Sequence, residues 1–88
     1  MIKIYTKTTC PYCDMAKQLL EMFGFDYEAI NIEQDSEARE WLLNEGHRSV
    51  PQIYVNEHLV EGGFSGLKGA GKAGITVLMD KAQKEKKD

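Results

Sequence analysis

Two cysteines, Cys10 and Cys13, are separated only by a proline and a tyrosine, and the chain has no others. A disulfide between them would close a very short loop, so it would restrict the unfolded chain little and add little stability. In a reducing compartment this spacing is typical of redox chemistry or of metal binding. The pair is therefore the candidate reactive site, and thiol–disulfide exchange and zinc binding are the two chemistries to weigh.

The position of Cys10 favours the thiolate that disulfide exchange requires. Pro11 suits the first turn of a helix, because its missing N–H group would be unbonded there, so Cys10 is expected at the helix N-cap. Free N–H groups at a helix start, together with Lys7 just upstream, lower the pKa of a cysteine thiol below its usual value of about 8.5. Cys10 is predicted to attack a disulfide, and Cys13 to resolve the mixed disulfide that results.

Zinc is disfavoured because a structural zinc site needs four ligands, usually with a second closely spaced pair. His47 and His58 are the only histidines, and they are too far apart in the sequence to form such a pair. They are interpreted as ordinary surface residues, and no metal site is predicted.

A second pattern, GxxxxGK over residues 66–72, resembles a phosphate-binding loop. It has Ala73 where a Ser or Thr would hold magnesium, and no parallel strand clearly leads into it. It is interpreted as a flexible glycine-rich connection.

Length and composition limit the remaining possibilities. The chain has 88 residues, a formal net charge of −3 and 28% charged residues, which is ordinary for a soluble globular protein, and one domain over residues 1–88 is expected. The mild negative charge gives no reason to expect nucleic acid as a partner. No stretch approaches the ~20 apolar residues that span a bilayer, and the N-terminus lacks a basic segment followed by an apolar run. A cytoplasmic protein without a membrane partner is therefore expected.

Hydrophobic periodicity predicts two strand–helix units followed by a hairpin. Residues 2–6 and 27–32 alternate as strands do, whereas 11–24 and 35–46 have helical spacing, with Asp35 or Ser36 as a helix cap. Strands joined through a helix should be parallel, and residues 52–55 and 58–61 should form an antiparallel hairpin. The fold class is therefore α/β, with a four-stranded mixed sheet flanked by helices.

The segment after the hairpin is unusual in composition. Six of the eight glycines fall in residues 62–74, and each lowers helix propensity by about 1 kcal/mol relative to alanine. Ser65 is expected to cap a short helix there. Residues 75–87 regain a helical pattern that should dissolve into a solvated end rich in lysine and glutamate.

The chain resembles the glutaredoxin family from residue 2 to about residue 67. The resemblance rests on four motifs in this order: Ile4-Tyr5-Thr6-Lys7, Cys10-Pro11-Tyr12-Cys13, Ser49-Val50-Pro51-Gln52-Ile53 and Gly62-Gly63. This combination is far more specific than a lone CxxC, which thioredoxins and metal sites share. It implies a thioredoxin fold, no tightly bound cofactor and glutathione as co-substrate, and we expect a monomer.

The resemblance also implies roles for individual residues. Cys10 would be the nucleophile and Cys13 the resolving thiol, and Lys7 would pair with the glycine carboxylate of glutathione. The backbone of Val50 would pair in strand fashion with the cysteinyl part of glutathione, and Pro51 would follow a cis peptide bond. The implied glutathione contacts are Lys7, Tyr12, Arg48, Val50, Pro51, Gly63, Phe64 and Ser65.

One departure keeps alternatives open. Many glutaredoxins have aspartate near the position of Ser65, so this chain lacks a carboxylate for the γ-glutamyl ammonium group. The Phe64-Ser65-Gly66 stretch, with residues 24–28, is similar to redoxins that serve ribonucleotide reductase and are recycled by thioredoxin reductase, although these usually lack Pro-Tyr between their cysteines. Besides a glutathione-dependent oxidoreductase that reduces protein disulfides and glutathione mixed disulfides, the alternatives are such a redoxin and a carrier of a [2Fe–2S] cluster ligated by Cys10 and glutathione.

Overall fold

The computed structural model describes residues 2–86, with side chains described for residues 2–80. Its strands form one sheet in the order β2-β1-β3-β4. β1 and β2 are parallel, whereas β1 pairs antiparallel with β3 and β3 with β4, which confirms the predicted mixed sheet. The strands are β1 (Ile2–Thr6), β2 (Tyr27–Asn31), β3 (Gln52–Val55) and β4 (His58–Val60).

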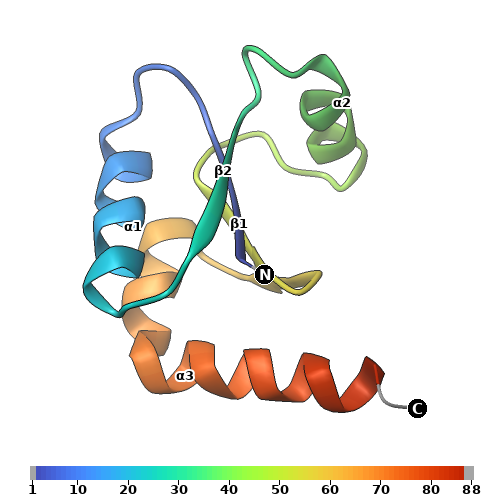
Figure 1. Ribbon diagram of the computed structural model, residues 1–88. Helices are drawn as coiled ribbons and strands as arrows, with labels where there is room; N and C mark the ends of the chain where they lie inside the picture. The colour runs from blue at the N-terminus through green and yellow to red at the C-terminus, as the bar shows by residue number, and fades with distance from the viewer. Residues whose placement is uncertain (1, 87–88) are drawn as a thin grey trace.

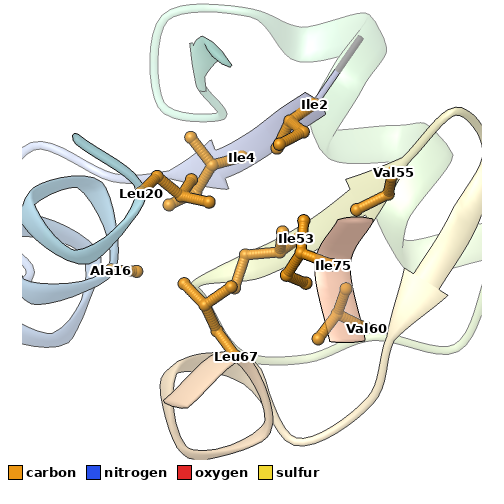
Figure 2. Packing of buried hydrophobic residues seen from close by; sticks show 9 residues of the cluster. All are labelled: Ile2, Ile4, Ala16, Leu20, Ile53, Val55, Val60, Leu67 and Ile75. Carbon is orange, nitrogen blue, oxygen red and sulfur yellow. The ribbon is translucent and has the colours of Figure 1, made fainter. Parts of the chain in front are cut away.

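Helices cover both faces of this sheet. α1 (Pro11–Met22) and α3 (Gly63–Lys86) lie on one face and α2 (Ser36–Asn44) on the other (Figure 1). The side chains between the sheet and α1 and α3 form the main core (Figure 2), and they are Ile2, Ile4, Ala16, Leu20, Ile53, Val55, Val60, Leu67 and Ile75.

β1 is one of the two inner strands, and its side chains contribute to hydrophobic clusters on both faces of the sheet. Ile2 and Ile4 enter the main core, whereas Tyr5 enters a second, smaller cluster with Leu42 of α2 and Tyr54 of β3. Successive side chains of a strand point to opposite faces, so one short strand joins the two layers. Packing on both faces holds the end of β1 in place, and the chain runs from there to Cys10.

The glycine-rich segment differs from the prediction. It is not a flexible connection, because α3 begins at Gly63 and Ser65 lies in its first turn instead of capping it. Gly71, with φ 69°, interrupts the helix, so α3 consists of two helical pieces joined at a kink. Packing offsets the poor helix propensity, since Leu67 is fully buried and Gly66 lies too close to the backbone of Glu61 to carry a side chain.

The C-terminal end also differs from the prediction. The helix continues to Lys86, where the sequence predicts a dissolving end, and residue 87 of the predicted helix lies outside the described residues. Within residues 2–86, no helix combines the length and the hydropathy that crossing a membrane requires.

Candidate active site

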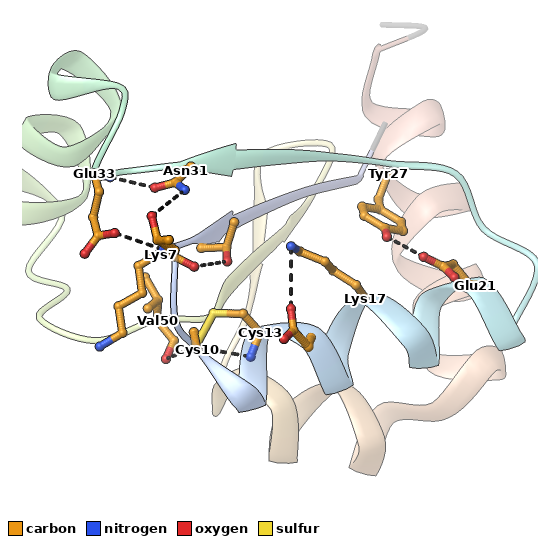
Figure 3. Close-up of polar contacts among 12 residues, drawn as sticks. Lys7, Cys10, Cys13, Lys17, Glu21, Tyr27, Asn31, Glu33 and Val50 are labelled. Carbon is orange, nitrogen blue, oxygen red and sulfur yellow. Dashed lines mark hydrogen bonds and ion pairs between the residues drawn. A yellow bond between two sulfur atoms is a disulfide. The ribbon is translucent and has the colours of Figure 1, made fainter.

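Cys10 is the N-cap of α1, as predicted. Its backbone is extended, with φ −150° and ψ 96°, and Pro11 takes the first helical position. The Sγ atom of Cys10 accepts a hydrogen bond of 3.2 Å from the backbone N–H of Cys13 (Figure 3). Sulfur at this point faces the free N–H groups and the positive end of the helix dipole, which favour a thiolate.

Cys10 and Cys13 are joined by a disulfide, with their Cα atoms 5.2 Å apart. Cys10 is 7% exposed, whereas Cys13 is fully buried at 0%. An incoming molecule can therefore reach Cys10 first, and Cys13 lies behind it. The greater exposure of Cys10 agrees with its role as the attacking thiol, and the burial of Cys13 agrees with its role as the resolving thiol.

The loop before β3 lies against this disulfide. The Val50–Pro51 peptide bond is cis, as the resemblance implies. The carbonyl oxygen of Val50 lies 3.9 Å from the Sγ atom of Cys10 (Figure 3). A backbone segment at such a position can pair with an extended peptide, so a peptide bound along Val50 would pass directly beside the reactive sulfur.

A groove of about 550 Å³ opens beside the cysteine pair. Tyr12, which is 61% exposed, and Phe64 lie on it with ring centroids 6.2 Å apart. Gly63, with φ 59°, approaches Pro51 so closely that an added Cβ would lie 3.1 Å from its carbonyl oxygen. The groove contains six of the predicted glutathione contacts: Tyr12, Val50, Pro51, Gly63, Phe64 and Ser65.

Lys7 and Arg48, the other two predicted contacts, line a neighbouring cavity of about 220 Å³ instead. His47, Ser49 and Val50 line both this cavity and the groove, so the two spaces adjoin along this segment. Arg39 of α2 also lines the smaller cavity, which therefore carries three cationic side chains over an apolar floor. The sequence analysis missed Arg39. Its position three residues before the buried Leu42, on the same helix face, is the signal that could have found it.

His47 contributes to the site in a way that the sequence analysis did not foresee. The sequence predicts an ordinary surface residue, whereas His47 is partly buried and lines both cavities. Its Nε2 atom lies 2.7 Å from the hydroxyl oxygen of Tyr54, a hydrogen bond that fixes the ring. His58 lies on the edge strand β4, and among the described side chains no group of three or more His, Cys, Asp or Glu is arranged so that it could hold a metal ion.

The loop between β1 and Cys10 is held by the chain that follows β2. The backbone N–H of Thr8 donates a hydrogen bond of 3.0 Å to Glu33, and the side chain of Asn31 donates one of 3.2 Å to the Thr8 hydroxyl (Figure 3). Hydrogen bonding from Thr8 holds the pKa of Glu33 below its usual value, and the charge of Lys7 adds to this effect. These contacts, which the sequence analysis missed, fix the approach of the chain to Cys10.

Comparison with known sequences identifies the family. The sequence model of the glutaredoxin family matches residues 2–60. The chain belongs to the glutaredoxin family. A probable glutaredoxin from Synechocystis sp. is 40% identical over 75 residues, a match that covers 81% of this chain and 85% of that protein. As a member of the glutaredoxin family, the chain is a thiol–disulfide oxidoreductase.

Solved glutaredoxin-like structures confirm the thioredoxin fold. The glutaredoxin-like protein NrdH-redoxin of Escherichia coli superimposes with a TM-score of 0.58 at 40% identity, covering 59% of this chain and 68% of that one. A buckwheat glutaredoxin–glutathione complex superimposes with a TM-score of 0.75 at 22% identity, covering 93% and 78%. The second likeness is one of fold alone.

Proposed function

We propose that residues 1–88 act as a single glutaredoxin domain that uses glutathione to reduce protein disulfides and glutathionylated proteins. The observation that carries this proposal is the groove beside Cys10, which shares His47, Ser49 and Val50 with a neighbouring cationic cavity. Glutathione is a short anionic peptide with its thiol near the middle, and such a molecule suits both spaces. A reactive dithiol also needs a reducing compartment, so we place this reaction in the cytoplasm, with the protein acting as a monomer.

The two cysteines would divide the reaction between them. With a glutathionylated protein, the Cys10 thiolate attacks the glutathione sulfur, forms a Cys10–glutathione disulfide and releases the protein as a thiolate that takes up a proton. The thiolate of a second glutathione then attacks this disulfide, which gives oxidised glutathione and restores the Cys10 thiolate. With a protein disulfide, the Cys10 thiolate opens it and forms a Cys10–protein mixed disulfide. Cys13 then attacks the sulfur of Cys10 and releases the protein as a dithiol. Two glutathione molecules reduce the resulting Cys10–Cys13 disulfide and leave as oxidised glutathione.

Groups on both sides of Val50 would orient glutathione. Lys7, Arg39 and Arg48 line the cavity that would take its glycine carboxylate, and charge-assisted hydrogen bonds of this kind are about twice as strong as neutral ones. At the other end, Ser65 lies in the first turn of α3, whose free backbone N–H groups can donate hydrogen bonds to the γ-glutamyl carboxylate. Glutathione is thus held mainly by its two carboxylates.

A redoxin recycled by thioredoxin reductase, with ribonucleotide reductase as its partner, is the second candidate. It is favoured by the Phe64-Ser65-Gly66 stretch and by the 40% identity to the NrdH-redoxin of Escherichia coli, for which a thioredoxin-like activity profile is described. Because Ser65 carries no charge, it offers no ion pair to the γ-glutamyl ammonium group.

A coupled assay decides between the two donors. The oxidised protein is supplied with NADPH and either glutathione plus glutathione reductase or thioredoxin reductase alone, and NADPH consumption is followed with a disulfide substrate. We expect efficient turnover in the glutathione arm. Efficient turnover by thioredoxin reductase, without turnover by glutathione, would overturn the proposal in favour of the redoxin.

A further inference from the structure

A third cavity, of about 790 Å³, lies between α2 and the sheet, away from the disulfide. It is lined by residues from β1 and β3, from α2 and its two ends, and from the turn between β3 and β4. Neither Cys10 nor Cys13 lines it. None of the residues that line this third cavity lines either space beside the cysteine pair, so the third cavity is a separate site.

Three aromatic rings form one side of the third cavity. Trp41 stacks on Tyr5 with ring centroids 5.4 Å apart and an interplanar angle of 22°, and it meets Tyr54 at 5.2 Å and 65°. Tyr5 and Tyr54 are buried, whereas Trp41 is 41% exposed. The two tyrosines therefore hold the indole ring in place while much of its surface stays accessible.

Carboxylates surround this exposed indole. Glu37 and Glu45 lie four residues before and after Trp41 on α2, and therefore near the same helix face, and both line the cavity. Asp35 and Glu57 line it as well, against a single cation, Lys3. Formally, four negative charges thus face one positive charge.

Within residues 2–80, this negative charge is only partly balanced. Among the side chains that the structure describes, Glu37, Glu45 and Glu57 make no ion pair. Glu45 is also the C-cap of α2, where the helix dipole adds negative potential. The tyrosines also sense negative charge: burial and then Glu28 and Asp35 raise the pKa of Tyr5, and burial and then Glu45 raise that of Tyr54.

We propose that the third cavity binds an organic cation, a guanidinium or primary ammonium group on an alkyl chain, over the accessible face of Trp41. An indole ring is the best aromatic partner for such a cation, and carboxylates around it add attraction and hydrogen-bond acceptors. The cavity has room for the alkyl chain as well as the charged head. A free polyamine and an arginine or lysine side chain of another protein share this chemistry, so both are tested.

The test uses the full, oxidised chain and two probes, spermidine and the peptide acetyl-Gly-Arg-Gly-amide. Trp41 is the only tryptophan, so its fluorescence reports binding directly. We expect a saturable change that weakens as salt is added, because exposed charges are screened. Tighter binding of spermidine assigns the site to free polyamines, and tighter binding of the peptide assigns it to protein side chains.

Calorimetric titration of four variants tests the residues themselves. Trp41→Leu should weaken binding by about five- to thirtyfold, with Trp41→Phe between this variant and the wild type. Because Trp41 also packs on Tyr5, Glu45→Gln gives a second and independent test, and it should weaken binding by about two- to fivefold. Glu40→Gln makes the same charge change on α2 outside the cavity and should leave binding unchanged. Absence of saturable binding of either probe, or equal weakening by Glu40→Gln and Glu45→Gln, would overturn the proposal.

Discussion

The Sγ atom of Cys10 lies 3.9 Å from the carbonyl oxygen of Val50, although the two residues are 40 positions apart in the chain. This contact joins the N-cap of α1 to the loop before β3. It places a reactive sulfur next to a backbone segment that can pair with a peptide. A molecule that pairs there brings its own sulfur to Cys10 and not to the buried Cys13.

The two cysteines should differ in what their loss does to activity. Cys10→Ser should reduce turnover to background with every substrate, because no other thiol in the site is exposed. Cys13→Ser should retain reduction of a glutathione mixed disulfide, since a second glutathione can complete that reaction without Cys13. Steady-state turnover with a glutathionylated peptide and with a protein disulfide measures both effects. Equal losses in the two variants would contradict the assigned roles.

The N-cap position should be visible in the pH dependence of alkylation. In the reduced protein, iodoacetamide should modify Cys10 at a lower pH than Cys13, because the helix start favours the Cys10 thiolate and Cys13 is buried. Mass spectrometry of digested samples gives the rate at each cysteine. Lys7→Gln should move the Cys10 profile to higher pH. A Cys10 midpoint near the ordinary value of about 8.5 would show that the helix start does not activate this thiol.

Ser65 offers a way to strengthen the hold on glutathione. Ser65→Asp places a carboxylate at the start of α3, where it can pair with the γ-glutamyl ammonium group. This carboxylate also interacts favourably with the positive end of the helix dipole. We expect the KM for glutathione to fall by about two- to fivefold, with little change in kcat. Ser65→Asn, which has nearly the same shape without the charge, is the control. The same gain in Ser65→Asn would mean that charge is not the cause.

Two glycines of α3 should respond oppositely to alanine. A Cβ at Gly66 would clash with the backbone carbonyl of Glu61, so Gly66→Ala should lower the free energy of unfolding by about 1–3 kcal/mol. A Cβ at Gly69 would meet nothing within 4 Å, so Gly69→Ala should raise it by about 0.5–1 kcal/mol through better helix propensity. Urea unfolding of the two variants measures both. Stabilisation by both would contradict the close approach at Gly66.

Tyr27 should lose its proton only at an unusually high pH. Its hydroxyl donates a hydrogen bond of 2.6 Å to Glu21, which is the main reason that the pKa of Tyr27 is raised to about 12 (Figure 3). The folded protein therefore holds this proton more tightly than the unfolded chain. The resulting stability is complete below pH 10, the ordinary tyrosine value, and is lost as the pH rises through about 12.

Absorbance of tyrosinate against pH measures this ionisation. Tyr27→Phe should remove a step near pH 12 and should lose less stability than the wild type between pH 10 and 12. Glu21→Gln keeps the ring but removes the carboxylate, so the step should move toward pH 10. A step that stays near pH 12 in Glu21→Gln would show that Glu21 is not its cause.

Local signals in the sequence were sufficient for much of this structure. Alternation and helical spacing predict all four strands and the first two helices, because these patterns record which side of each element is buried. The Cys-Pro dipeptide likewise predicts the N-cap of α1, since proline suits only the first turn of a helix. The position of Cys10 is therefore readable from a few neighbouring residues.

Features that depend on distant segments could not be predicted in the same way. Six glycines in residues 62–74 indicate a poor helix, yet α3 forms because the backbone of Gly66 packs against Glu61 and because Leu67 is buried. Similarly, the stacking of Trp41 on Tyr5 depends on how α2 lies across the sheet. The hydrophobic periodicity of a segment shows which of its faces is buried, but not which other segment covers that face.

The start of α3 lies beyond the residues that the sequence model of the glutaredoxin family matches. The match ends at residue 60 and includes both cysteines and Pro51, whereas Gly63, Phe64 and Ser65 close the groove from beyond it. The residues that exchange bonds therefore lie within the matched stretch, whereas three of the proposed glutathione contacts come from a helix start beyond it. A graft of one helical turn could redirect such a protein to a different electron donor while its thiol chemistry stayed untouched.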